Sequence, residues 1–301
     1  MLHLRLLAAA VMIALLTAVL WIDLTVFQDS ILLHLFFLAG VWLSFTEFWK
    51  ICRATGHQTF SIWGTFSGCA LVVVHYLSMR LATNPVNWIP PGVVANLSNG
   101  ALAVAILGAF LLAAKRHQFE ASLGALAVTC LGFLYVYFLP SFVLTLRHTG
   151  PAGTIGGATA TWNLFGHKMV VATIVLAKGC DVWAFAIGRL LGKHKAFPSL
   201  SPGKTIEGLA AGLVGSILTS LFLWWKPIGV LTQFTPVKAC IIGLCIGLAS
   251  IMGDLSESLL KRSAGAKDAG VAVPGYGGVM DVIDSLMVAG PVAYFLIPAM
   301  L

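Results

Sequence analysis

Apolar runs of roughly 17 to 25 residues recur along the whole chain, and they constrain its fold more than any other feature. Each run is long enough to cross the ~30 Å hydrocarbon layer of a bilayer as an α-helix. Hydrophobic residues make up 59% of the chain, well above the ~45–50% that is usual in soluble domains. A transmembrane β-barrel would instead show alternating segments of ~10 residues, and the sequence has no such pattern. The chain is therefore predicted to be an all-α polytopic integral membrane protein.

Nine membrane-spanning helices are expected, and the distribution of positive charge predicts their orientation. The expected spans are about 4–27, 30–49, 60–82, 93–114, 120–142, 167–190, 205–225, 236–252 and 279–300. With a cytoplasmic N-terminus, twelve of the eighteen Lys and Arg residues fall in cytoplasmic loops and five outside, while Lys178 lies within a span. This asymmetry predicts an inward N-terminus and an outward C-terminus in the cell's inner (cytoplasmic) membrane. The first apolar stretch is too long for a signal peptide core and is interpreted as an uncleaved first span.

The first half of the chain contains few residues that could serve as catalytic or ligand-binding groups. We therefore expect residues 1–145 to be a scaffold of membrane helices and residues 146–301 to be the catalytic membrane region. Glu47 is interpreted as part of a surface pair with Lys50 at the end of the second span. The net charge of +7 does not indicate nucleic acid, because the basic residues lie in the loops and form no tract interleaved with aromatic residues. The six cysteines have no metal-ligand spacing and are interpreted as small buried hydrophobes.

Charge is concentrated between residues 253 and 285, although only 10% of the chain is charged. The ionisable residues of this stretch are Asp254, Glu257, Lys261, Arg262, Lys267, Asp268, Asp281 and Asp284. Ionisable groups at the edge of a bilayer are costly, which favours a functional site. Carboxylates are suited to Mg²⁺, and Lys and Arg to phosphate oxygens. Asp281 and Asp284 are three residues apart at the expected start of a helix and so share a face. From composition alone, a solvated loop with ordinary flanking charges is the alternative.

A second polar region begins inside the sixth span, where Lys178 and Asp181 are three residues apart. They could form a structural ion pair between helices or belong to a site, and the sequence leaves both open. The stretch 193–212 follows on the expected cytoplasmic side. Its GKT at 203–205 resembles the end of a P-loop, but Pro198 stands where that motif needs Gly, so a Walker nucleotide site is rejected. We expect a turn here and a helix that starts at about Thr205.

Both polar regions lie on the same expected side of the membrane, which favours one site assembled from the two. Such a site would combine acidic metal ligands with basic phosphate ligands and would suit phosphoryl or nucleotidyl transfer to a lipid. The stretch SLLKRSAGAKDAGVAVPGYGGVMDVIDS at 258–285 resembles the signature of the phosphatidate cytidylyltransferase (CDP-diacylglycerol synthase) family. Two upstream blocks, from Asp181 to Gly208 and GDLSES at 253–258, resemble further blocks of that family in the same order.

The resemblance implies a reaction that joins phosphatidate to CTP and gives CDP-diacylglycerol and pyrophosphate in phospholipid synthesis. It implies that Mg²⁺, with a second cation of unknown identity beside it, is held by Asp254, Asp281 and Asp284. It further implies a catalytic phosphate site of Lys261, Arg262, Lys267 and Asp268, and a substrate pocket of Ser201, Lys204, Thr205, Glu207 and Asp181. A homodimer is also what the family suggests. Tyr276 and Val282 replace a His and an Arg of the family signature, so the roles of those two positions are not transferred.

Two other functions compete with this interpretation. A CTP-dependent lipid kinase or a synthase that acts on another lipid phosphate would need similar residues. An ion-coupled transporter, from a different class, would use Lys178, Asp181 and the Gly-broken segment as an ion path. The polar blocks have no counterpart in the first half of the chain, whereas many transporters carry paired internal repeats.

Overall fold

The computed structural model of the protein describes residues 2–27, 29–86, 88–115, 119–150, 160–266, 270 and 277–301. The chain forms two compact units. Unit 1 is built mainly from Met1–Ser141 and Ser263–Val282, and unit 2 mainly from Ala160–Arg262 and Ile283–Leu301. The C-terminal signature stretch is therefore shared between the units. The expected boundary near residue 145 between scaffold and catalytic region stays a prediction.

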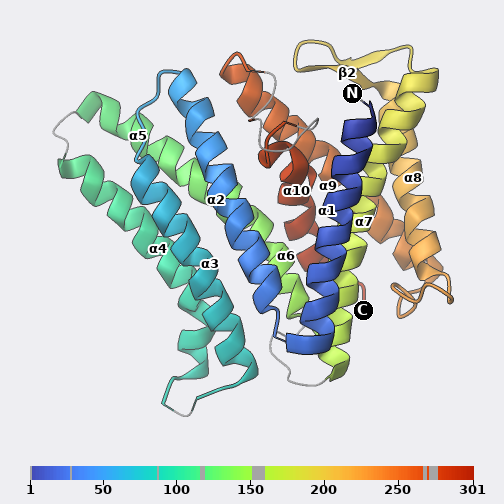
Figure 1. The fold of residues 1–301 in the computed structure, drawn as a ribbon, viewed down its shortest axis with the longest axis horizontal. Coiled ribbons are helices and arrows are strands. Elements are labelled where there is room, and N and C mark those ends of the chain that lie inside the picture. Colours follow the sequence, from blue (N-terminus) through green and yellow to red (C-terminus); the bar gives the residue numbers. More distant parts are fainter. Residues whose placement is uncertain are drawn as a thin grey trace. The chain divides into compact units, whose positions relative to one another are not determined.

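The N-terminal part of the chain is a series of helices joined by short connections (Figure 1). The elements are α1 (Leu2–Ile22), the π-helical segment η1 (Asp23–Phe27), α2 (Ile31–Ala54), α3 (Ser61–Thr83), α4 (Pro91–Lys115), α5 (Phe119–Gly132), the π-helical segment η2 (Phe133–Phe138) and α6 (Leu139–Arg147). In unit 1, α2 packs on α3, α3 on α4 and α4 on α5. Glycines bring α2 and α3 close together, because a Cβ at Gly64 would overlap the ring of Trp49.

Unit 2 contains the remaining long helices and a short hairpin. Its elements are α7 (Ala160–Leu191), β1 (Lys195–Phe197), β2 (Ser201–Thr205), α8 (Ile206–Trp224), α9 (Pro236–Ser263) and most of α10 (Met280–Ala299). The two strands are antiparallel and lie over the ends of α7 and α8 (Figure 1). The α7 and α8 backbones approach closely, since a Cβ at Gly208 would lie 2.8 Å from the carbonyl oxygen of Ala184.

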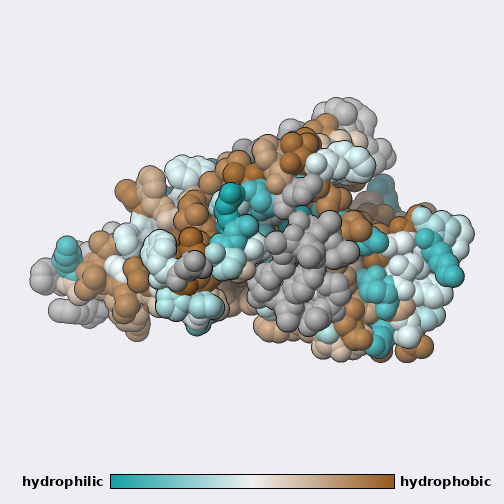
Figure 2. Space-filling view, turned by 90° about the horizontal axis from the view of Figure 1, so that it is seen from below, coloured by the Kyte–Doolittle hydropathy of each residue, from teal (hydrophilic) through white to brown (hydrophobic). Residues whose placement is uncertain are grey.

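The helical membrane-protein class predicted from the sequence is confirmed. In the described part of the chain, nine helices are long and apolar enough to cross a bilayer, and they match the nine expected spans in order. Large hydrophobic side chains are exposed on these helices, and Figure 2 shows hydrophobic residues on the visible face beside hydrophilic ones. Lipid can cover such surfaces, whereas water would not favour them.

Two local predictions were wrong. The turn expected before α8 is part of the β1–β2 hairpin, whose strands are too short to give a clear alternating pattern. The eighth span was expected to end near residue 252, but α9 continues to Ser263. A helix can extend beyond the apolar stretch that spans the membrane, so the end of that stretch does not mark the end of the helix. The polar block at 253–258 therefore lies on a helix.

The surface role expected for Glu47 was also wrong. Glu47 is only 3% exposed, and its carboxylate accepts hydrogen bonds from the backbone N–H groups of Val279 and Met280 within unit 1. The nearby Lys50 suggested a surface pair only because the sequence shows neighbours along the chain and not contacts between distant segments.

Candidate active site

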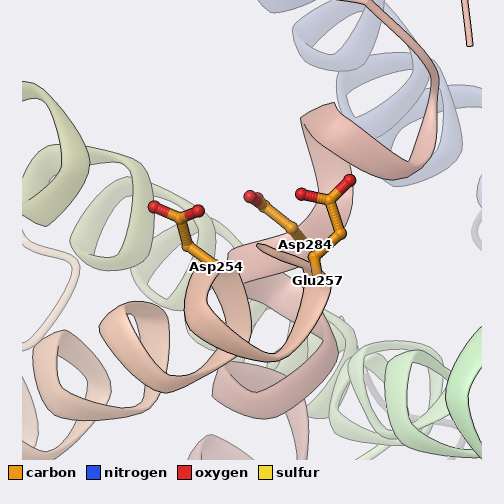
Figure 3. Close-up of side chains that lie close together, drawn as sticks. All are labelled: Asp254, Glu257 and Asp284. Atoms are coloured by element: carbon orange, nitrogen blue, oxygen red, sulfur yellow. The ribbon is translucent and has the colours of Figure 1, made fainter. Parts of the chain in front are cut away.

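Three carboxylates gather in unit 2 where α9 meets α10. Asp254 and Glu257 are three residues apart on α9 and share a face, and Asp284 comes from α10. One carboxylate oxygen of each lies within 4.8 Å of the others, and Figure 3 shows the three groups close together. Gly253 permits this approach, because a Cβ there would overlap the carbonyl oxygen of Asp284 and lie 2.9 Å from Cα of Ser285. We call Asp254, Glu257 and Asp284 the acidic cluster.

Each carboxylate of the acidic cluster has a lysine beside it. The paired atoms are Lys204 Nζ and Asp254 Oδ2 at 2.8 Å, Lys261 Nζ and Glu257 Oε2 at 2.7 Å, and Lys178 Nζ and Asp284 Oδ1 at 3.3 Å. The lysines come from β2, α9 and α7, so the site joins three elements besides α10. Paired charges offset part of the cost of removing each ion from water. Ammonium groups and carboxylate oxygens therefore lie side by side.

The Lys178–Asp181 pair predicted from the sequence is present and adjoins the acidic cluster. Lys178 Nζ lies 3.4 Å from Asp181 Oδ2 as well as 3.3 Å from Asp284 Oδ1. The hydroxyl oxygen of Ser250 on α9 lies 2.9 Å from the other carboxylate oxygen of Asp181. The pair thus links α7 to both α9 and α10, and it contributes to the structure while lying at the site.

A cavity of about 600 Å³ opens beside these residues in unit 2. Its polar lining includes Asp181, Arg189, Lys195, Ser201, Lys204 and Asp254. The volume falls in the ~300–1,000 Å³ range of small-molecule sites. Three cations and two acids in one cavity would suit a polyanion bound together with a divalent ion. Arg189 and Lys195 were not among the site residues predicted from the sequence, although both lie in the block from Asp181 to Gly208 that resembles the family.

Strand β2 supplies three of the predicted substrate-binding residues. Ser201 and Lys204 line the cavity, and so does Thr205 at the end of the strand. Thr205 is also the N-cap of α8, since its side-chain oxygen accepts a hydrogen bond from the Gly208 N–H at 3.1 Å. The prediction that α8 starts at about Thr205 is confirmed.

Glu207 lies at the base of the hairpin. Its carboxylate accepts hydrogen bonds from the backbone N–H groups of Lys193 at 3.1 Å and His194 at 3.2 Å. The Nδ1 atom of the His194 ring lies 2.6 Å from the other oxygen. Glu207 therefore fixes the hairpin to the first turn of α8. Contact of Glu207 with a substrate stays a prediction.

The end of α9 also contacts the hairpin. The Nε atom of Arg262 donates a hydrogen bond to the carbonyl oxygen of Leu200 at 3.1 Å, while Lys261 pairs with Glu257. Two of the four residues predicted for the phosphate site, Lys261 and Arg262, thus lie next to the acidic cluster and to the turn between the strands.

Lys267, Asp268 and Tyr276 are outside the described residues. Asp281 and Val282 belong to unit 1, where the Gly278 N–H donates a hydrogen bond to the Asp281 carboxylate at 2.5 Å. Asp281 precedes Asp284 by three residues on α10, as the sequence predicted.

The structure adds Glu257 to the acids at this site. The sequence interpretation chose Asp254, Asp281 and Asp284 as metal ligands because the family resemblance carried those positions. Glu257 is buried, with 1% exposure, and lies one helical turn from Asp254. The three-residue spacing of Asp254 and Glu257 would indicate that they share a helix face. That inference required knowing that α9 continues through this block.

The acidic cluster has the donor set that Mg²⁺ prefers, which is oxygen from carboxylates. Two oxygens that bind the same Mg²⁺ stand at most ~4.2 Å apart, because each metal–oxygen distance is ~2.1 Å. The oxygens of the cluster lie within 4.8 Å of one another, so small side-chain rotations would bring them into range. The residues present therefore fit a divalent cation.

The fold and the site together define a class of protein: a polytopic helical membrane protein in which paired carboxylates and lysines lie beside a cavity. The sequence model of the Cytidylyltransferase family matches residues 3–300. The chain belongs to this family.

Individual relatives agree with this assignment. The chain is 31% identical over 194 residues to a phosphatidate cytidylyltransferase of Synechocystis sp., covering 60% of this chain and 65% of that protein. It is 37% identical over 183 residues to phosphatidate cytidylyltransferase 4, chloroplastic, of Arabidopsis thaliana, covering 56% and 45%. A phosphatidate cytidylyltransferase of Haemophilus influenzae is 35% identical over 127 residues, covering 42% and 44%. The matches span between about two fifths and two thirds of these relatives' length.

Proposed function

We propose that the protein is a phosphatidate cytidylyltransferase, which converts phosphatidate and CTP to CDP-diacylglycerol and pyrophosphate. The observation that carries the proposal is the acidic cluster of Asp254, Glu257 and Asp284, with a lysine at each carboxylate and a cavity beside it. The names of the relatives point to the same reaction.

The reaction needs only one displacement at phosphorus. An oxygen of the phosphatidate phosphate attacks the α-phosphorus of CTP and forms the new phosphorus–oxygen bond. The bond between the α-phosphorus and the bridging oxygen breaks, and pyrophosphate leaves with that electron pair. Because the lipid phosphate is already an anionic nucleophile near neutral pH, no covalent enzyme intermediate is needed. The protein's task is to orient two polyanions and stabilise the charge that develops.

The cations of the cavity would do most of this work. Lys204 near the end of β2 would bind the phosphate groups of CTP, together with Arg189 and Lys195. Lys261 and Arg262 at the end of α9 would bind the lipid phosphate. Several cations that converge on one region can hold two polyanions in a fixed relative orientation.

Mg²⁺ would be held by the acidic cluster, and Asp281 is proposed as a further ligand because the family resemblance implies it. Bound there, the ion would supply positive charge that offsets the developing charge on the transferring group and on pyrophosphate. The lysines already beside the carboxylates would then turn to the phosphate oxygens, since a carboxylate that binds the ion no longer needs them as its main partner.

We further propose that the protein lies in the inner membrane with the site facing the cytoplasm, where CTP is present. This orientation rests on the twelve-to-five distribution of Lys and Arg. A C-terminal reporter that is active only outside the cytoplasm tests it. An active reporter agrees with the outward C-terminus, and an inactive reporter with stable expression contradicts it.

A homodimer is also proposed, and crosslinking in the membrane tests it.

The activity is tested with purified protein in micelles that contain phosphatidate, CTP labelled in the cytosine ring, and Mg²⁺. A labelled lipid and one pyrophosphate per lipid formed would support the proposal. Release of labelled CDP would indicate a lipid kinase, and turnover with another lipid phosphate alone would indicate a related synthase. No turnover would contradict the proposal, and ion flux through liposomes would then favour a transporter. The Asp284→Asn variant is the control for contaminating activity.

A further inference from the structure

Glu47 lies in the C-terminal half of α2, far in the sequence from every residue of the signature. Its Oε1 accepts a hydrogen bond from the Val279 N–H at 2.9 Å, and its Oε2 accepts one from the Met280 N–H at 2.9 Å. The partners are 232 and 233 residues away and belong to the same unit. Met280 is the first residue of α10, so one buried carboxylate caps the start of that helix.

Two glycines of the signature segment permit the close approach of the Glu47 carboxylate. A Cβ at Gly278 would overlap the Glu47 carboxylate, and a Cβ at Gly270 would lie 2.6 Å from its Oε1. Both glycines belong to the stretch that resembles the family signature. Their lack of a side chain is therefore explained by a close approach to Glu47.

The contact meets a physical need of the helix. The first N–H groups of an α-helix have no partner within the helix, and a buried one without an acceptor is costly. A carboxylate is the strongest such acceptor, and the positive end of the helix dipole in turn stabilises its charge. Gly278, the residue before Val279, donates its N–H to Asp281. Three consecutive N–H groups are therefore satisfied by two carboxylates, those of Glu47 and Asp281.

We propose that Glu47 is a positioning residue for the reaction, which sets the start of α10 and thereby orients the carboxylate of Asp281 in the same unit. Asp281 directly follows the residue that Glu47 holds, and Asp284 lies one turn further along the same helix. The expected effect on the reaction rate rests on the proposed function. The expected order of the first turn of α10 is independent of the proposed function.

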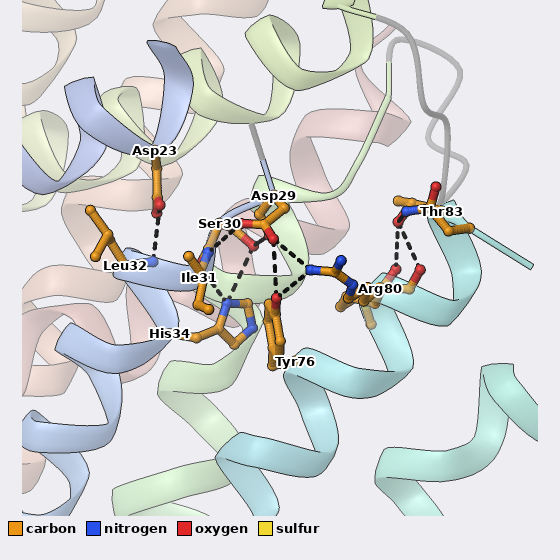
Figure 4. A network of polar contacts seen from close by, with 11 residues as sticks. Asp23, Asp29, Ser30, Ile31, Leu32, His34, Tyr76, Arg80 and Thr83 are labelled. Atoms are coloured by element: carbon orange, nitrogen blue, oxygen red, sulfur yellow. Dashed lines mark hydrogen bonds and ion pairs between the residues drawn. The ribbon is translucent and has the colours of Figure 1, made fainter. Parts of the chain in front are cut away.

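Unit 1 offers a matched control. Asp23 is a fully buried carboxylate that accepts hydrogen bonds from the N–H groups of Leu32 at 2.9 Å and Leu33 at 2.7 Å, at the start of α2 (Figure 4). It makes the same kind of contact as Glu47, but α2 begins there with no residue of the proposed site. Asp23→Asn and Glu47→Gln each place an amide where a carboxylate accepted two backbone hydrogen bonds.

The test compares these two variants with the unmodified protein. In Glu47→Gln we expect kcat to fall about tenfold or more, equivalent to ~1.4 kcal/mol, while KM for CTP changes less than about twofold. The Mg²⁺ concentration for half-maximal rate should rise. Asp23→Asn should leave kcat of the folded protein within about twofold, even if its thermal midpoint falls as far as that of Glu47→Gln. Equal kcat values for the two variants would overturn the proposal.

Hydrogen exchange provides a measurement that does not depend on turnover. In the unmodified protein the amides of Val279 and Met280 should exchange slowly, although first-turn amides are usually poorly protected. Glu47→Gln should raise their exchange rate about tenfold or more, and Asp23→Asn should not. Fast exchange of both amides in the unmodified protein would overturn the proposal. This result holds even if Glu47→Gln does not fold or the protein proves to catalyse another reaction.

Discussion

The Nζ atom of Lys204 lies 2.8 Å from Oδ2 of Asp254, which joins the β1–β2 hairpin to α9 in the lining of the cavity. The Lys204 side chain is only 16% exposed and that of Asp254 is 34% exposed, so the cation is the more shielded partner. Shielding strengthens the attraction of a cation for phosphate as well as for a carboxylate. The pair therefore places a strong phosphate-binding group directly beside an oxygen ligand for a metal.

The first prediction concerns Lys204. We expect Lys204→Ala to lower kcat/KM for CTP by about 10²-fold or more, because it removes a cation that stabilises developing negative charge in a shielded site. Lys204→Arg should recover part of this loss, since it restores the charge but not the shape of the ammonium group. Steady-state rates of CMP-lipid formation measure both effects.

The exposed Lys226 at the opposite end of α8 provides the control for loss of a positive charge. Lys226→Ala should stay within about twofold of the unmodified rate. If Lys204→Ala were equally active, the assignment of Lys204 to the phosphate site would be wrong.

The second prediction concerns the metal and Glu257. Removal of divalent ions with EDTA should abolish turnover, and added Mg²⁺ should restore it. Glu257→Gln should raise the Mg²⁺ concentration for half-maximal rate about tenfold or more, because a neutral amide is a weaker ligand than a carboxylate. Binding of Mn²⁺ in place of Mg²⁺, followed by electron paramagnetic resonance without substrate, measures the affinity directly.

A matched acid outside the cluster separates ligation from loss of charge. Asp29, which pairs with Arg80 at 2.7 Å in unit 1, serves this purpose. Asp29→Asn should leave Mn²⁺ affinity unchanged. Unchanged affinity in Glu257→Gln would remove Glu257 from the ligand set and return the assignment to the aspartates alone.

The sequence was sufficient for the helices and for residue pairs that share one helix near the candidate site. Apolar runs report directly on membrane crossing, so the nine spans follow from local composition. The three-residue spacings of Lys178 with Asp181 and of Asp281 with Asp284 report on helix faces, and the structure places each pair on one helix. Such features depend on neighbours along the chain.

Contacts between distant segments could not be predicted in this way. Nothing near Glu47 in the sequence indicates that its partners are residues 279 and 280. The same holds for Gly253, whose place beside Asp284 depends on how α9 and α10 pack. Glu257 could be predicted only in part, because the sequence shows its spacing from Asp254 but not its burial. The missing information is tertiary packing, which a single sequence does not show.

The third prediction concerns Asp281, the second residue of α10, to which the family resemblance assigns a role as metal ligand. Asp281→Asn should abolish turnover while the protein still inserts and folds, because the amide keeps the shape of the side chain but loses its charge. Size-exclusion chromatography and the thermal midpoint check folding, and rates at limiting Mg²⁺ check function. A near-normal rate at limiting Mg²⁺ would show that Asp281 is not a ligand.

The last prediction concerns Gly253, where α9 and α10 touch. A methyl group at this position would overlap the backbone carbonyl oxygen of Asp284, which cannot rotate away as a side chain could. Gly253→Ala should therefore force α9 and α10 apart, destabilise the protein by ~1–3 kcal/mol and disperse the acidic cluster. Gly100→Ala on α4 is the control, since a Cβ there meets nothing within 4 Å and Ala favours a helix. Thermal midpoints and Mn²⁺ affinity should fall in Gly253→Ala alone, and equal values in the two variants would mean that the acidic cluster does not depend on this close contact.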